Sequence, residues 1–376
     1  MAKPQLSEAG QATLDRRYMA AAIRLSRRNA GRTSTNPSVG TIVVRDDGAG
    51  PMIVGTGVTA VGGRPHAETE ALAEAGELAR GATAYVTLEP CAHHGRTPPC
   101  ANALVNAGIA RVVGAASDPD PRVSGKGYAI LRAAGVEVVE KVLAAEAAEQ
   151  MAGYLTRSLK KRPEVTLKLA LSSDGKIGRK GAGQVAITGE IARREVYLMR
   201  AEVDAILVGI GTALEDNPAL TVRLPGLENR SPARIILDRQ IRLPETSKLV
   251  SGVDRVPLYV AACIEADPHR RATLERAGVR FIGTETYSGE VALPELLEDL
   301  AALGMASVLV EGGARVAKAF LEEGLVDRII LFKGPDAIGE DGIASPIDAA
   351  HIPAGFRELR QMRFGEDSYA EWVRDL

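Results

Sequence analysis

The sequence predicts an α/β protein of two domains, on three observations. The chain has 376 residues, whereas a single domain usually holds about 100–200. Apolar, β-branched runs alternate with helix-forming segments along the chain, which is typical of α/β sheets. A basic run at 160–162, followed by a proline that disfavours helix in the preceding residue, interrupts this alternation. We therefore expect domains at 1–153 and 154–376, with a linker at 154–163.

The first domain is expected to alternate helices and strands. Apolar residues at helical spacing predict a helix over 13–30, and the runs 39–44 and 52–58 flank an Asp-Asp-Gly turn signal, which favours a hairpin. The composition of 66–79 favours a helix. The remaining elements are expected as strand 83–88, helix 98–107, strand 111–117, helix 126–134, strand 136–142 and helix 143–162.

The second domain is expected to begin again with a strand, over 165–171. Further apolar runs predict strands at 204–209, 233–238, 256–262, 279–283, 307–312 and 327–334. Helical patterns fit 189–201, 293–303 and 314–324. This alternation again predicts an α/β sheet.

Composition and charge narrow the class of function. The 46 Lys and Arg residues nearly balance the 48 Asp and Glu residues, whereas a general nucleic-acid binder usually has a basic excess. No apolar run approaches the roughly 20 residues that span a bilayer, and the N-terminal segment lacks the apolar core of a secretory signal. Three cysteines are too few for a disulfide scaffold. We expect a cytoplasmic protein with no membrane or nucleic-acid partner.

One histidine and two cysteines point to a zinc site in the first domain. His66 lies at an expected helix start, and Cys91 and Cys100 follow an expected strand. One imidazole and two thiolates suit a four-coordinate zinc ion whose fourth position is open to water. Glu68, two residues after His66, could transfer protons without ligating the metal.

Two other interpretations remain open at this point. A structural zinc site would take four protein ligands, and His93 or His94 could supply the fourth. A buried, metal-free cysteine pair fits less well with the local density of His, Pro and Gly. The His-x-Glu … Pro-Cys-x-x-Cys pattern of zinc deaminases is only partly kept, because the two cysteines are nine positions apart.

Longer stretches of the first domain resemble one family. The segments 66–68, 87–100, 36–40 and 118–121, with the long cysteine spacing, are similar to those of the bifunctional deaminase–reductase family of riboflavin biosynthesis. The resemblance implies a cytidine-deaminase-like three-layer α/β/α first domain. It also implies one zinc ion bound by His66, Cys91 and Cys100, with Glu68 as the catalytic proton shuttle.

The same resemblance implies substrate contacts in this domain. Arg96 occupies the position of a basic residue near the substrate phosphate. The residues implied to contact the pyrimidine or the ribose are Asn36, His93, Asp118 and Asp120. For Asn36 a turn role before a proline is an equal alternative, and for Asp118 the alternative is a loop cap.

In the second domain, three glycine-containing segments lie at expected strand ends, at 172–176, 209–212 and 311–314. Backbone amides at such a junction can bind a phosphate through a helix N-terminus. Each segment could instead be a tight turn that needs glycine. No GxGxxG fingerprint follows the first strand of this domain.

The resemblance extends over this second domain and implies a dihydrofolate-reductase-like α/β fold that uses NADPH. The residues implied to face the cofactor are Ala170, Ala186, Thr212, Asp216, Gly313, Ala314 and Arg315. Those implied to face the substrate are Gln184, Arg200, Leu220, Arg223 and Glu311. The family's Ser-x-Trp segment is replaced by Gln-Val-Ala at 184–186, so an aromatic wall against the cofactor is missing or supplied elsewhere.

Together, these implications predict a bifunctional enzyme of riboflavin biosynthesis. Zinc-dependent deamination of a phosphorylated ribosylaminopyrimidine would be followed by NADPH-dependent reduction of its ribosyl group to a ribityl group. A homo-oligomer, dimer or tetramer, is expected, because the apolar strands of the second domain offer surfaces for self-association. One alternative is a nucleic-acid base deaminase with an accessory nucleotide-binding domain. Another is a non-catalytic protein with structural zinc and a nucleotide-sensing domain.

Overall fold

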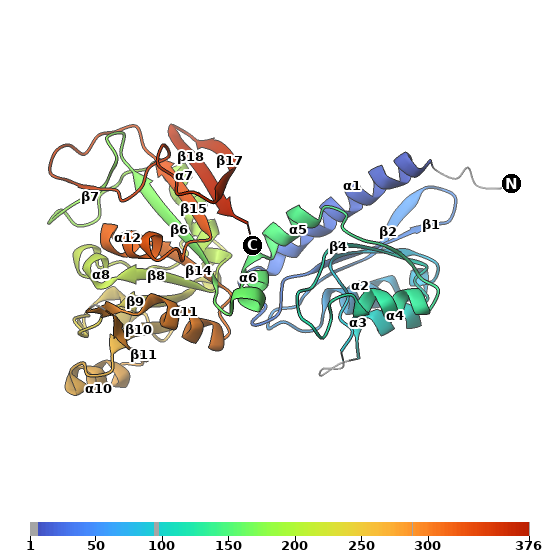
Figure 1. The fold of residues 1–376 in the computed structure, drawn as a ribbon, viewed down its shortest axis with the longest axis horizontal. Helices are drawn as coiled ribbons and strands as arrows, with labels where there is room; N and C mark the ends of the chain where they lie inside the picture. Colours follow the sequence, from blue (N-terminus) through green and yellow to red (C-terminus); the bar gives the residue numbers. More distant parts are fainter. Residues whose placement is uncertain (1–6, 94–97, 288, 376) are drawn as a thin grey trace. The chain divides into compact units, whose positions relative to one another are not determined.

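The computed structural model describes residues 7–93, 98–287 and 289–375. The chain divides into two compact units, Met1–Leu159 and Lys160–Leu376, which run from blue to green and from green to red in Figure 1. The division falls in helix α6 (Ala152–Lys160), so the segment 154–163, expected as a linker, is helical over most of its length. Both units contain a sheet with helices, as the sequence predicts.

A five-stranded sheet forms the centre of the first unit, in the order β2-β1-β3-β4-β5. The β1–β2 pair is antiparallel, as predicted for the hairpin, whereas β3, β4 and β5 pair in parallel. The strands are β1 (Gly40–Asp46), β2 (Pro51–Val58), β3 (Thr83–Leu88), β4 (Arg111–Ala116) and β5 (Glu137–Val139). The helices are α1 (Glu8–Ser26), α2 (Ala67–Ala75), α3 (Cys100–Asn106), α4 (Lys126–Ala133) and α5 (Ala144–Gln150).

Helices cover both faces of this sheet and make three layers. Helices α1 and α5 lie on one side, and α2, α3 and α4 lie on the other (Figure 1). A Cβ added at Gly40 of β1 would lie 2.2 Å from the Ala22 carbonyl oxygen of α1, and one at Gly57 of β2 would lie 2.0 Å from the Ala67 carbonyl oxygen of α2. These glycines therefore let each helix backbone approach the sheet closely, which holds the start of α2 against the strands.

The second unit is built on a nine-stranded sheet in the order β11-β10-β9-β8-β14-β6-β15-β18-β17. The strands from β11 to β15 are parallel, and β18 and β17 are antiparallel to their neighbours. The strands are β6 (Glu164–Leu171), β8 (Ala205–Gly209), β9 (Ala233–Leu237), β10 (Leu258–Cys263), β11 (Arg280–Thr284), β14 (Ser307–Glu311), β15 (Arg328–Lys333), β17 (Phe356–Phe364) and β18 (Asp367–Arg374). Two short pairs join β7 (Lys176–Arg179) to β16 (Gly342–Ala344), and β12 (Thr286–Tyr287) to β13 (Glu290–Val291).

Alternating side chains of the parallel strands enter two different cores. In β8, Leu207 packs in the core with helices α11 and α12, whereas its neighbours Ile206 and Val208 pack in the core with α8, α9 and α10. Helix α7 covers Ile330 and Phe332 of β15. The helices are α7 (Glu190–Ala201), α8 (Ile210–Asp216), α9 (Lys248–Ser251), α10 (Pro268–Arg276), α11 (Leu293–Ala302) and α12 (Ala314–Glu322).

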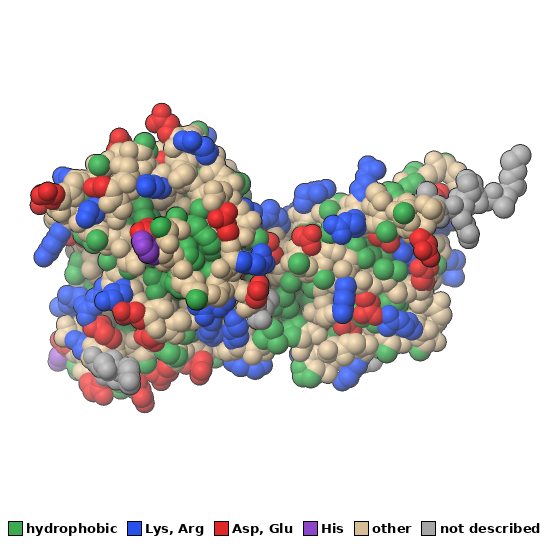
Figure 2. Space-filling model, turned by 45° about the horizontal axis from the view of Figure 1, so that its top comes forward, with side chains coloured by type: hydrophobic (Ala, Val, Ile, Leu, Met, Phe, Trp, Pro, Cys, Tyr) green, Lys and Arg blue, Asp and Glu red, His purple; other side chains and the backbone are tan. Residues whose placement is uncertain are grey.

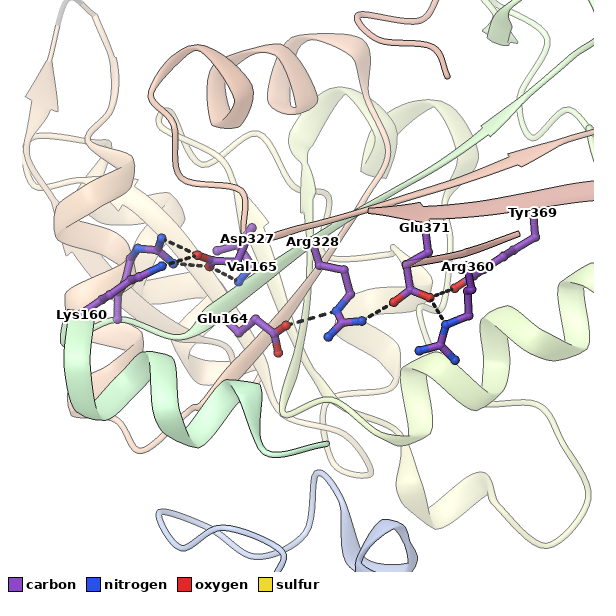
Figure 3. A network of polar contacts seen from close by, with 9 residues as sticks. Lys160, Glu164, Val165, Asp327, Arg328, Arg360, Tyr369 and Glu371 are labelled. Carbon is purple, nitrogen blue, oxygen red and sulfur yellow. Dashed lines mark hydrogen bonds and ion pairs between the residues drawn. The ribbon is translucent and has the colours of Figure 1, made fainter. Parts of the chain in front are cut away.

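A chain of ion pairs crosses the sheet from β6 to β17 (Figure 3). The Arg328 guanidinium on β15 lies 3.2 Å from the Glu164 carboxylate on β6 and also pairs with Glu371 on β18. Glu371 also accepts a hydrogen bond from the Tyr369 hydroxyl at 2.6 Å and forms an ion pair with Arg360 at 2.8 Å. These contacts connect the antiparallel hairpin to the parallel part of the sheet.

Several details differ from the sequence-based expectations or go beyond them. The helix expected over 143–162 is interrupted at Met151, so α5 and α6 are separate. The segment 356–364 forms strand β17, which was not predicted. Cys263, the cysteine that the predicted zinc cluster leaves over, ends strand β10 half-buried, and its thiol donates a hydrogen bond to Glu265.

The surface carries charges of both signs. Figure 2 shows Lys and Arg side chains intermixed with Asp and Glu side chains over the visible face of each unit, in keeping with the balanced composition. Within the described ranges, no helix is both long and apolar enough to cross a membrane.

Two candidate active sites

Three ligand-type side chains converge in the first unit. His66 is the N-cap residue of α2, Cys91 follows strand β3, and Cys100 is the first residue of α3. His66 Nδ1 lies 3.3 Å from Cys100 Sγ and 3.7 Å from Cys91 Sγ, and the three ligand atoms all lie within 4.8 Å of one another. The ends of one strand and the starts of two helices therefore assemble the predicted cluster.

The donor set and its spacing fit a zinc ion. Zn–S distances near 2.3 Å and Zn–N distances near 2.0–2.1 Å in a tetrahedron require ligand nitrogen and sulfur atoms about 3.5 Å apart, which is close to the measured 3.3 and 3.7 Å. Three protein donors leave one tetrahedral position open. Among the residues that the structure describes, the cluster has no fourth member, and His93 is not part of it; His94 lies outside the described residues.

The start of helix α3 stabilises negative charge on one of the thiols. The Cys100 amide donates a hydrogen bond to Cys91 Sγ at 3.2 Å. Hydrogen bonds from Cys100 and from His66 outweigh burial and lower the pKa of Cys91 to about 4. A thiolate is the form that ligates a metal, so this environment prepares Cys91 as a ligand.

Glu68 lies in the first turn of α2, beside the cluster. Its side chain is buried, with 4% of the residue exposed. Burial, with a further contribution from the Cys91 charge, raises the pKa of the Glu68 carboxyl to about 7. A carboxyl group that is close to half-protonated near neutral pH suits proton transfer in both directions.

The residues predicted to contact the substrate in the first unit have different surroundings in the structure. The Asn36 amide donates to the Gly63 carbonyl at 2.7 Å, so it ties two loops together. His93 Nδ1 is buried and has no hydrogen-bond partner within the described part of the chain. Asp118 and Asp120 lie near His93, and Arg96 lies outside the described residues.

The two aspartates differ in their environment. Asp118 is buried and accepts hydrogen bonds from the Tyr154 hydroxyl of α6 and from the Asp120 amide, at 3.0 and 2.9 Å. Burial raises the pKa of Asp118 in spite of these bonds. Hydrogen bonds from Arg122 instead lower the pKa of Asp120 to about 2. Tyr154 was not predicted, because one tyrosine in an amphipathic helix is usually a packing residue.

The second unit contains a cavity of about 660 Å³ at the carboxyl ends of β6, β8 and β14. This is the edge of a parallel sheet at which ligands usually bind. All twelve residues that the resemblance implied for this domain line it: Ala170, Gln184, Ala186, Arg200, Thr212, Asp216, Leu220, Arg223, Glu311, Gly313, Ala314 and Arg315.

The start of helix α12 forms a glycine cradle in this cavity. Gly312 and Gly313 have φ of 101° and 72°, a backbone conformation that favours glycine. A Cβ on Gly313 would lie 3.1 Å from the Thr212 hydroxyl oxygen, and Gly313, as the N-cap residue of α12, has no side chain with which to cap the amides there. Free amides and a narrow, side-chain-free approach fit the phosphates of a dinucleotide. The Arg315 side chain, in contrast, is 81% exposed and pairs with Glu290.

The segment after α8 brings other predicted residues to the cavity. Asn217 and Leu220 have φ of 39° and 53°, so the chain turns sharply there. The segment is held by hydrogen bonds from the Lys248 amide to Asn217 Oδ1, at 2.9 Å, and from the Val222 amide to the Ser231 hydroxyl, at 3.0 Å. This framework positions the residues on either side of Leu220 against the cavity.

A buried charge cluster lies on the sheet side of the cavity. Arg200 pairs with Glu311, and Lys168 Nζ lies 3.6 Å from the same carboxylate. Burial opposes ionisation, but the charges of Arg200 and Lys168 lower the pKa of Glu311 to about 2. Burial also lowers the pKa of Lys168. Lys168 was not predicted, although a single lysine within the apolar strand VTLKLAL is a signal that could have identified it.

An aromatic side chain that was also not predicted lines this cavity. Tyr197 of α7 lies against two guanidinium groups, with ring-centroid distances of 5.3 Å to Arg223 Cζ and 5.5 Å to Arg200 Cζ. Position 186, where the family often has tryptophan, is an exposed alanine at the cavity. The aromatic side chain at this cavity therefore comes from helix α7 and not from position 186.

Comparison with known proteins connects both units to one family. Residues 163–368 match the family described as RibD C-terminal domain, and residues 12–116 match the cytidine and deoxycytidylate deaminase zinc-binding region. The riboflavin biosynthesis protein RibD of Aquifex aeolicus is 39% identical, with 87% of this chain and 88% of the relative covered. That of Escherichia coli is also 39% identical, with 93% and 96% covered.

Solved structures agree over nearly the whole chain. Acinetobacter baumannii RibD is 36% identical with a TM-score of 0.84, and the match covers 97% of this chain and 100% of that one. A Thermotoga maritima protein is 33% identical with a TM-score of 0.83 and the same coverage. It is described as a diaminohydroxyphosphoribosylaminopyrimidine deaminase/5-amino-6-(5-phosphoribosylamino)uracil reductase.

These similarities confirm the predicted fold class, with a cytidine-deaminase-like domain followed by a RibD reductase domain. The His66, Cys91 and Cys100 cluster lies within the matched zinc-binding region. The matched reductase family covers more than half of the chain, and the cavity lies within it. The chain therefore belongs to the RibD family and is a bifunctional deaminase and reductase of riboflavin biosynthesis.

Proposed function

We propose that the first unit deaminates 2,5-diamino-6-(5-phosphoribosylamino)pyrimidinone and that the second unit reduces the ribosyl group of the resulting 5-amino-6-(5-phosphoribosylamino)uracil. The observation that carries this proposal is the pairing of two sites in one chain. A His/Cys/Cys cluster lies beside a buried glutamate in one unit, and a polar cavity with a glycine cradle lies in the other. The domains are proposed at 1–153 and 154–376.

In the deaminase unit, His66, Cys91 and Cys100 are proposed to hold the zinc ion. When bound, zinc polarises a water molecule and lowers its pKa toward about 7. The Glu68 carboxylate accepts a proton from this water as its oxygen bonds to the amino-bearing ring carbon. Glu68 then returns the proton to the departing nitrogen, so that the C–N bond breaks and ammonia leaves.

The remaining candidates of this unit are proposed to orient the substrate. His93 has a buried nitrogen with no partner in the described residues, which is available for a ring or ribose group. Asp118, held by Tyr154, can accept a hydrogen bond from the substrate, and Asp120 lies next to it. The contact of Arg96 with the phosphate remains a prediction from the sequence, and Asn36 acts through the loop that it ties to Gly63.

In the reductase unit, we assign the substrate phosphate to Arg223 and the ribose to Glu311. Arg223 is exposed at the cavity, whereas Arg200 is committed to Glu311 through two contacts. A paired carboxylate still has free lone pairs that can accept from ribose hydroxyls. Arg200 then keeps Glu311 ionised and oriented. Leu220 and Gln184 complete the lining on the substrate side.

The cofactor side of the same cavity fits a dinucleotide. NADPH, when bound, supplies a hydride to C1′ of the opened ribosyl group. The amides at Gly313, Ala314 and Arg315 would contact its diphosphate, because they begin helix α12. The other residues proposed on this side are Ala170, Ala186, Thr212 and Asp216. A homo-oligomeric state, a cytoplasmic location and the absence of a nucleic-acid partner remain predictions from the sequence.

The proposal is tested by supplying the diaminopyrimidine phosphate to the zinc-loaded chain and measuring ammonia and NADPH oxidation separately. We expect equal initial rates of ammonia release with and without NADPH, and NADPH oxidation only after deaminated product has formed. NADPH oxidation without prior ammonia release, or ammonia release from a cytosine-containing oligonucleotide instead of the phosphoribosyl substrate, would contradict it.

A further inference from the structure

We propose that Tyr197 is a positioning residue of the reductase, which holds the Arg223 guanidinium where it binds the substrate phosphate. The inference rests on the phosphate role proposed above for Arg223. Tyr197 lies on α7 and lines the cavity. Its ring centroid is 5.3 Å from Arg223 Cζ, which comes from a different segment of the chain.

The two arginines beside this ring have different surroundings. Arg200 is 11% exposed, and its guanidinium contacts Glu311 twice and the Thr221 carbonyl once. Arg223 is exposed, and within the described part of the chain the Tyr197 ring is the side chain that holds its guanidinium. Arg200 would therefore keep its position without Tyr197, whereas Arg223 would regain its rotamer freedom.

Stacking on an aromatic ring is well suited to preparing an arginine for an anion. A cation–π contact does not use the guanidinium N–H groups as donors to an oxygen atom, so these donors stay free for a two-point contact with a phosphate. A carboxylate partner would occupy those same donors and neutralise the charge. Tyr197 thus restricts Arg223 without competing with the ligand, and less freedom is lost when the phosphate binds.

The location of Tyr197 predicts which step of the reaction the loss of its ring should affect. It precedes Arg200 by one helical turn, so its ring is anchored beside the buried Arg200–Glu311 pair. The ring therefore links the part of the cavity assigned to the ribose with the part assigned to the phosphate. Loss of the ring should therefore weaken binding of the substrate phosphate. The Arg200–Glu311 pair assigned to the ribose should keep its position, so the rate of the chemical step should not change.

The test compares Tyr197→Leu with Tyr197→Phe in the full-length, zinc-loaded chain supplied with deaminated substrate and NADPH. We expect Tyr197→Leu to raise the reductase KM for this substrate about three- to fivefold, the effect of one exposed cation–π contact, with kcat and the KM for NADPH nearly unchanged. Tyr197→Phe should restore the parental KM, because phenylalanine keeps the ring. Tyr197→Met carries the same expectation as Tyr197→Leu if the leucine variant folds poorly.

A matched control removes a similar pair away from the cavity. Tyr259 lies on β10 and Arg280 begins β11, and Arg280 Cζ is 5.6 Å from the centroid of the Tyr259 ring. Neither residue lines the cavity. Tyr259→Leu should leave the reductase KM unchanged. A KM increase in this control equal to that of Tyr197→Leu would show a general loss of packing and overturn the proposal.

Double substitution separates this inference from the proposed role of Arg223. Arg223→Ala alone should raise the KM, and adding Tyr197→Leu to it should cause no further increase. If Arg223→Ala leaves the KM unchanged, both the phosphate assignment and the positioning role are wrong. If Arg223→Ala raises it but Tyr197→Leu does not, or if Tyr197→Leu acts equally in both backgrounds, the phosphate assignment stands and the positioning role is wrong.

Discussion

The guanidinium of Arg200 and the carboxylate of Glu311 form a two-point ion pair, with Nε–Oε1 and Nη2–Oε2 distances of 2.7 and 2.9 Å. Lys168 Nζ approaches the same carboxylate at 3.6 Å. The pair joins α7 to the end of β14, so a contact inside the cavity also connects a helix to the sheet. Two cations therefore depend on one buried anion.

Replacing Glu311 should destabilise the second unit. Glu311→Ala leaves Arg200 and Lys168 buried without their counter-charge, so we expect the free energy of unfolding of this unit to fall by about 3–5 kcal/mol in urea titration. Glu190→Ala removes an exposed pair with Arg194 on the same helix α7 and should cost less than about 1 kcal/mol. Equal losses in the two variants would contradict the view that Glu311 compensates buried charge.

Zinc binding should depend on two of the three cysteines. We expect Cys100→Ser to abolish stoichiometric zinc, measured by metal analysis, and to abolish ammonia release, because the cluster loses a thiolate donor. Cys263→Ser should keep one zinc ion per chain, since Cys263 lies on β10 of the other unit. A Cys100→Ser variant with a full zinc content would exclude the proposed ligand set.

The glycine cradle should be sensitive to one methyl group. At Gly313 a Cβ meets both a left-handed backbone, with φ of 72°, and the Thr212 hydroxyl at 3.1 Å. Left-handed backbone costs a non-glycine residue about 1–2 kcal/mol, so Gly313→Ala should raise the KM for NADPH roughly five- to thirtyfold. Gly226→Ala, at a left-handed position with open space around it, should leave this KM unchanged. If the two variants have the same KM for NADPH, the cradle does not contact the cofactor.

The start of the second unit should lose stability at low pH through Asp327. This carboxylate accepts hydrogen bonds from Lys160 and from the Val165 amide, at 3.1 and 3.0 Å, and also pairs with Arg162 (Figure 3). Burial opposes ionisation, but the hydrogen bonds and charge of Arg162 hold the pKa of Asp327 below its usual value. A lowered pKa means that the ionised group stabilises the folded state above its unfolded pKa, near 3.9, and loses that contribution as the pH falls through the folded value.

The expected result is a pH-dependent difference between the parent and Asp327→Asn. The difference in free energy of unfolding should be constant between about pH 5 and 8 and shrink below about pH 4. Asp341→Asn removes an exposed carboxylate and serves as the control for the change in net charge. A difference that grows as the pH falls would mean that the pKa of Asp327 is raised rather than lowered.

Sequence patterns predicted the regular elements better than the contacts between them. The run 83–88 is strand β3 with the same bounds, because most of its residues are apolar and all but the first are buried. Strand β17, at 356–364, was missed because it is an edge strand with charged or polar residues at five of its nine positions. Helix α10, at 268–276, was missed because it is mainly polar.

In the candidate sites, too, motifs were predicted better than contacts between distant segments. The motifs were enough to predict that His66, Cys91 and Cys100 form one cluster. In the structure their ligand atoms all lie within 4.8 Å of one another. No motif distinguishes a tyrosine that packs in a core from Tyr197, whose ring lies against arginines from two segments. Contacts of this kind depend on the tertiary fold, so they become visible only in the structure.

One chain holds two sites, each assembled within its own unit, and the variant Glu68→Gln separates their activities. We expect this variant to retain one zinc ion per chain and to lose ammonia release by at least about a hundredfold, the usual contribution of a general acid–base group. Its NADPH oxidation with supplied deaminated substrate should equal that of the parent and of Glu70→Gln, an exposed change on the same helix. Normal ammonia release by Glu68→Gln would exclude Glu68 as the proton shuttle, and a parallel loss of NADPH oxidation would show that the two sites are not independent.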